Sequence, residues 1–130
     1  MSRPPAGLIT AHRELAVAIV LIALFGAIWA GYVVSRVRGG RRLAIFGWVA
    51  TAALVLQALF GIVLAAAGAR PQDGLHFLLG PLTLLALPAG RWLARTERWT
   101  ARTRAIVVAG AWLVTLGLSL RAVGTGGGVG

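Results

Sequence analysis

The chain alternates between long uncharged stretches and short segments rich in arginine, glycine or proline. Residues 15–35 and 43–69 contain no charged side chain. Each of these runs is long enough to cross a hydrocarbon core of about 30 Å as a helix. A shorter apolar segment containing Pro81 and Pro88 follows. The fourth apolar segment has close to the minimum length for a helix that crosses the membrane. The pattern predicts an all-α fold, a four-helix transmembrane bundle.

The breaks between the apolar runs set the expected element boundaries. We expect helices over about 12–35, 43–68, 75–95 and 104–122. Residues 1–11 carry two prolines and a glycine, so they are predicted to form an irregular lead-in. The glycine-rich residues 123–130 are predicted to form a flexible tail. Close helix packing is expected at three glycine pairs: Gly26 and Gly31, Gly61 and Gly68, and Gly110 and Gly117.

Composition supports the membrane interpretation. Of the 130 residues 58% are hydrophobic and only 12% are charged, and a soluble domain of this size cannot bury so much apolar surface. The formal net charge of +10 would suit nucleic acid, but the arginines lie between apolar runs, which favours a lipid bilayer and no nucleic-acid partner. The chain has no cysteine, so disulfides, thiolate metal sites and c-type heme attachment are excluded.

The distribution of arginine predicts the orientation. The connections after the first and third helices hold nine arginines together, and the other side of the membrane holds four. Arginine-rich connections stay in the cytoplasm. The sequence therefore predicts an integral protein of a bacterial inner membrane with both termini outside.

The chain contains two histidines, His12 and His76, and both stand near the start of an apolar helix. An even number of crossings separates them, so they are predicted to lie at similar depth on the outer side. Neutral imidazole is a good ligand for iron, and a low-spin heme takes one on each face. Ala16 and Gly80, one turn further on, are small enough to leave room for a flat ring. The alternative is that both are interfacial histidines wetted by lipid headgroups.

Three more polar residues are candidates for the same site. Gln57 lies near the middle of the second apolar run, where it either joins two helices or hydrogen-bonds a bound group. Arg13 and Arg70 lie on the same predicted side as the histidines. Both are candidates for charge-assisted hydrogen bonds with heme propionates. No residue is assigned a catalytic role.

Most of the chain, from His12 to about Arg121, resembles one half of heme A synthase, an eight-helix membrane family related to the cytochrome oxidase assembly factor. The pair His12-Arg13 resembles the family's His-Arg pair at a helix start, and Gln57-Ala58-Leu59-Phe60-Gly61 resembles its Gln-x-x-x-Gly helix. Leu75-His76-Phe77-Leu78-Leu79 resembles its second histidine helix. The resemblance implies that His12 and His76 are heme ligands.

The chain also departs from that family. The catalytic half of the family carries a glutamate three residues before the histidine of the His-Arg pair, and Ile9 stands there in this chain. The cysteine pair of many members and the whole second half are absent. We therefore expect no catalytic activity from the chain alone.

Three functional hypotheses remain at this point. The first is a bis-histidine heme b protein for electron transfer or heme handling. The second is a cofactor-free accessory subunit of a larger respiratory or photosynthetic membrane complex. The third is a heme-modifying enzyme that works as a homodimer or with a partner.

Overall fold

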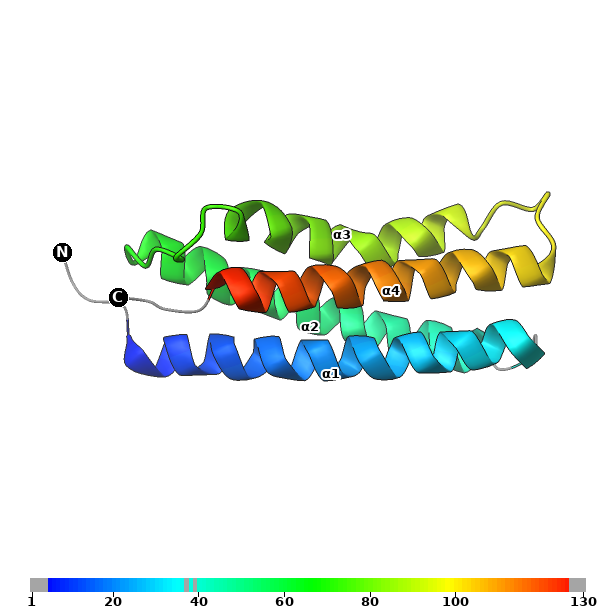
Figure 1. Ribbon diagram of the computed structural model, residues 1–130, viewed down its shortest axis with the longest axis horizontal. Coiled ribbons are helices and arrows are strands. Elements are labelled where there is room, and N and C mark those ends of the chain that lie inside the picture. The colour runs from blue at the N-terminus through cyan, green and yellow to red at the C-terminus, as the bar shows by residue number, and fades with distance from the viewer. Residues whose placement is uncertain (1–4, 37, 39, 127–130) are drawn as a thin grey trace.

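The described part of the chain forms four helices, which run side by side along the length of the molecule (Figure 1). The computed structural model describes residues 5–36, 38 and 40–126. The helices are α1 (Ala6–Arg36), α2 (Gly40–Ala66), α3 (His76–Leu93) and α4 (Ala101–Gly126). Helix α4 packs most extensively, against both α1 and α3, while α2 packs against α1 and α3. The predicted all-α four-helix bundle is confirmed, and α1 begins at the end of the bundle where α4 ends (Figure 1).

Three of the helices, α1, α2 and α4, are long and apolar enough to cross a membrane. Helix α3 has 18 residues, which at 1.5 Å per residue gives a length of about 27 Å. Large apolar side chains also cover the outside of the bundle. Leu21 is 61% exposed, Ile28 67% and Ile62 64%. Such surfaces are suited to lipid and not to water, which supports placement of the chain within a bilayer.

The first helix starts earlier than the sequence predicts. Residues 6–11 belong to α1, so the expected irregular lead-in over 1–11 is wrong for its described part, apart from Pro5. The carbonyl of Pro5 accepts hydrogen bonds from the amides of Leu8 and Ile9. A proline costs little at a helix start, where its missing N–H would have no helical partner. Residues 1–4 of the predicted lead-in lie outside the described residues.

The last helix is longer than predicted at both ends. It begins at Ala101 because the Thr100 hydroxyl accepts a hydrogen bond from the Thr103 amide at 3.1 Å, which caps the helix. It continues to Gly126, so the predicted flexible tail is wrong over 123–126, and 127–130 lie outside the described residues.

The second and third helices also differ at their ends, by one to three residues, from the predicted bounds. Helix α2 begins at Gly40 and ends at Ala66. Its end is closed by Gly68, which has a φ of 88°, while the amides of Gly68 and Ala69 bond back to Ala65 and Leu64. This paired arrangement stops a helix and favours glycine at the left-handed position. Helix α3 begins at His76 and ends at Leu93.

Two close contacts join α4 to its neighbours in the core. The ring of Trp112, only 1% exposed, lies against Gly26 of α1, where an added Cβ atom would overlap the ring. A Cβ atom on Gly90 of α3 would overlap the Ala111 side chain in the same way. Of the other glycines predicted to pack closely, Gly31, Gly110 and Gly117 face open space. Those three predictions are therefore wrong.

Candidate functional site

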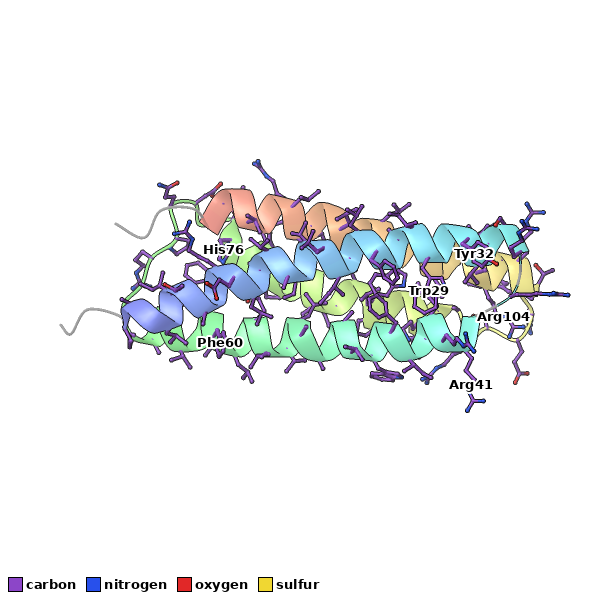
Figure 2. The ribbon with its side chains drawn as sticks, turned by 90° about the horizontal axis from the view of Figure 1, so that it is seen from below. Trp29, Tyr32, Arg41, Phe60, His76 and Arg104 are labelled. Carbon is purple, nitrogen blue, oxygen red and sulfur yellow. The ribbon has the colours of Figure 1, made fainter. Side chains whose placement is uncertain are left out.

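The two histidines meet at one end of the bundle. His12 lies in the second turn of α1, and His76 is the first residue of α3. Their ring centroids are 6.2 Å apart and the ring planes are inclined at 69°. Figure 2 shows His76 at the end of the bundle where α1 begins, far from Arg41 and Arg104. Both imidazoles are partly buried, so the protein sets their position.

The His76 ring is held by the last turn of α4. Its Nδ1 atom lies 3.1 Å from the carbonyl oxygen of Ala122. A carbonyl only accepts hydrogen bonds, so Nδ1 carries the hydrogen and donates it, which leaves the lone pair on Nε2. Thr125 also donates to the Ala122 carbonyl, at 3.1 Å, and is buried. A Cβ atom on Gly126 would lie 2.9 Å from His76 Cε1, so the absence of a side chain there makes room for the ring.

The His12 ring faces α2. Its Nε2 atom lies 3.3 Å from Nε2 of Gln57. The Gln57 amide nitrogen can only donate, so it donates to His12 Nε2, and the ring hydrogen is then on Nδ1. One helical turn beyond Gln57, a Cβ atom on Gly61 would lie 3.5 Å from His12 Cε1. Gln57 and Gly61, the two defining residues of the Gln-x-x-x-Gly pattern, therefore both face His12.

His12 and Gln57 each have a buried polar atom that is left without a partner. Among the described residues, His12 Nδ1, Gln57 Oε1 and Ser119 Oγ are buried and form no hydrogen bond within the protein. A buried polar group that lacks a partner costs about 1–3 kcal/mol. Native proteins contain few such groups, and a bound ligand is one common reason for them. His12 and Gln57 are thus hydrogen-bonded to each other, while one further polar atom of each lacks a hydrogen-bond partner within the protein.

The other predicted site residues differ in their exposure. Gly80 has open space where a side chain would be, and Ala16 is partly buried. Arg13 and Arg70 are exposed. Arg13 follows His12 directly, and Arg70 lies in the connection that leads to His76.

Sequence reasoning missed the contribution of α4. The His76 ring is held by Ala122, Thr125 and Gly126. The sequence predicts Ala122 at the end of a helix, and Thr125 and Gly126 in a flexible tail. One signal was present. Thr115, Ser119 and Thr125 are buried polar residues of α4, and Ser119 lies three residues before Ala122, on the same helical face.

The described part of the chain contains no group of three or more histidine, aspartate or glutamate side chains that could hold a metal ion. Two imidazoles are too few for a bare zinc ion, which takes four ligands in structural sites and three protein ligands in catalytic ones. A heme brings its own ring of nitrogen donors and needs only the two axial ligands. The pair therefore fits a heme better than a bare ion.

No protein-family model matches the chain, and comparisons with curated proteins and with solved structures gave no match either. The resemblance to one half of heme A synthase therefore stays a prediction. What is established is a helical bundle with three helices capable of crossing a membrane and a pair of histidines that converge at one end.

Proposed function

We propose that the chain is a membrane-integral heme protein in which His12 and His76 bind one heme b from opposite faces. The observation that carries the proposal is the convergence of the chain's two histidines, from α1 and α3, at a centroid separation of 6.2 Å. Metal–imidazole bonds of about 2 Å on either side of an iron place the two ligating nitrogens about 4 Å apart. The ring centroids then lie somewhat further apart, in the range of the observed separation.

The protein prepares the two ligands differently. The Ala122 carbonyl fixes the Nδ1–H tautomer of His76, and its Nε2 lone pair is the one offered to a metal. His12 Nε2 is hydrogen-bonded by Gln57, so the amide must turn away before this nitrogen can ligate. The exposed Arg13 and Arg70 are suited to pair with propionates at the bundle end.

A bound heme b would supply one-electron redox chemistry, which suits electron transfer or heme handling in a membrane. The chain's own contribution is to place two imidazoles, fix a tautomer and surround them with apolar helices. Ile9 stands where the synthase family has its catalytic glutamate, so no enzymatic reaction is proposed for the chain alone.

The second candidate function is a cofactor-free subunit that packs against a larger respiratory or photosynthetic membrane complex. One observation favours it. His12 Nε2 and His76 Nδ1 both contact neighbouring helices, so each imidazole already joins two helices without any ligand. Polar contacts of this kind hold membrane helices together.

An absorption spectrum separates the two candidates. The protein is expressed with an ample heme supply and purified in mild detergent. For a bis-histidine heme b we expect a Soret band, sharp α and β bands on reduction with dithionite, and one heme per chain in a pyridine hemochrome assay. Purified protein that contains no heme, although its helical circular dichroism is intact, would reject heme binding and leave the packing subunit as the better account.

We further propose that the arginine-rich connections face the cytoplasm. Among the described residues, nine arginines belong to the segments at that end of the bundle and three, Arg13, Arg70 and Arg121, to those at the histidine end. Arginine in short connections is retained inside. The chain has no cysteine of its own, so a thiol reagent can label only the cysteine that each substitution introduces. Ser35→Cys should resist a membrane-impermeant maleimide in intact cells, and Gln72→Cys should react. The reverse labelling would overturn the orientation.

A further inference from the structure

The end of the bundle opposite the histidines contains a cavity lined by three arginines. Its volume is about 390 Å³, and its walls come from all four helices. Arg91 reaches it from α3, Arg95 from the connection after α3, and Arg104 from the first turns of α4. Figure 2 shows Arg104 at this end of the bundle, which also carries Arg41 and Tyr32. Small-molecule sites typically enclose about 300–1,000 Å³, so the cavity is large enough for a ligand.

The lining has a charged part and an apolar part. None of the twelve lining residues is acidic. Leu43, Val108 and Trp112 are among the apolar ones. Ala101, the first residue of α4, also lines the cavity, so the positive end of that helix dipole adds to the arginine charges. The cavity therefore favours a ligand that combines a negative charge with an apolar portion.

Arg91 is held in position by α2. Its guanidinium carbon lies 4.2 Å from the centroid of the Trp48 ring, in a cation–π contact. The side chain passes over Gly47, where a Cβ atom would lie 3.3 Å from Nη1. Arg91 is thus ordered without a carboxylate. Its donors, with those of Arg95 and Arg104, match the fork geometry by which guanidinium groups bind phosphate oxygens.

We infer that this cavity binds the phosphate headgroup of an anionic membrane phospholipid. A phosphate ester supplies the charge, and the adjoining acyl chains supply the apolar portion. The arginine-rich end of the bundle lies at the membrane surface whichever leaflet it faces, since the helices on either side of the connections are apolar. A basic cavity between membrane helices at this level has a phospholipid headgroup as its most abundant anionic neighbour.

The test measures phospholipid retained by the purified protein. Wild type and variants are placed in nanodiscs of phosphatidylcholine with phosphatidylglycerol, transferred to detergent, and weighed by native mass spectrometry. The double variant Arg95→Gln/Arg104→Gln should retain about thirtyfold less phosphatidylglycerol, because each arginine near an anionic surface changes affinity about fivefold. The matched control is Arg98→Gln/Arg102→Gln, which removes two neighbouring exposed arginines that do not line the cavity.

One further variant tests the place of binding, and one competition experiment tests whether the bound phosphate belongs to a lipid. Ala44→Phe fills part of the cavity without changing charge, and it should lower phosphatidylglycerol retention while leaving the helical content unchanged. An equal loss in the control double variant, or full retention in Arg95→Gln/Arg104→Gln, would overturn the proposal, because binding would then reflect diffuse charge. Displacement of the lipid by millimolar inorganic phosphate would overturn the lipid source and assign the cavity to a soluble phosphate ester.

Discussion

Replacing either histidine by alanine should abolish the bis-histidine heme spectrum. Each variant removes one axial ligand of a site that has no third histidine in the chain. His12→Ala should leave a five-coordinate heme with a broadened, shifted Soret band, or no heme at all. His76→Ala should do the same. We expect the loss of the sharp reduced α band to be complete in both variants, measured by reduced-minus-oxidised difference spectra at equal protein concentration.

Imidazole rescue distinguishes a ligand from a residue that only supports the fold. Free imidazole added to His12→Ala or His76→Ala should restore a low-spin spectrum, because the alanine leaves space for the small ring. Gln57→Leu is the matched control. It removes the hydrogen bond to His12 but no metal ligand, so the α band should persist. If His12→Ala keeps the wild-type spectrum, His12 is not a ligand and the shared site is wrong.

The two histidine variants should differ in stability. His76→Ala also removes the hydrogen bond to the Ala122 carbonyl, worth about 0.5–1.5 kcal/mol net, and leaves the end of α4 less well held. His12→Ala instead removes the hydrogen bond between His12 and Gln57 of α2, which does not hold the end of α4. Amide hydrogen exchange over residues 119–126 should therefore rise more in His76→Ala than in His12→Ala, both compared without heme.

The second large effect is expected at Gly26. Gly26→Ala adds a Cβ atom that overlaps the buried ring of Trp112. The ring cannot move freely, because it stacks on Phe46 with centroids 5.5 Å apart and planes inclined at 19°. Adding a methyl group to a well-packed core costs about 1–3 kcal/mol, and Gly26→Leu should cost more. The free energy of unfolding is measured by sodium dodecyl sulfate titration in mixed micelles, with helical circular dichroism as the signal.

Gly31→Ala is the control for that measurement. Gly31 lies in the same helix and faces open space, so alanine meets nothing there and gains about 0.5–1 kcal/mol from its better helix propensity. Gly26→Ala and Gly31→Ala should therefore shift the unfolding free energy in opposite directions. Equal shifts in the two variants would show that the contact between α1 and Trp112 does not hold the bundle together.

Part of the candidate site follows from the sequence. The count of apolar runs predicts that His12 and His76 start helices on the same side, and the structure places their rings 6.2 Å apart. The pattern around Gln57 and Gly61 also marks α2 as a neighbour of the site. What no pattern indicated is that Gln57 faces His12 or that His76 bonds to Ala122. These pairs lie 45 and 46 residues apart in the chain, and helical periodicity relates only residues within a few turns.

The sequence by itself determined the helical class, the number of helices and the end of the bundle that carries the histidines. These depend on the length and order of apolar runs, which are local properties of the chain. Tertiary structure decided where α1 begins, where α4 begins and ends, which glycines pack closely, and which face of each helix points inward. A helix that is apolar all round carries no amphipathic signal for its buried face. Only side-chain packing, such as Trp112 on Gly26 and His76 on the last turn of α4, selects that face.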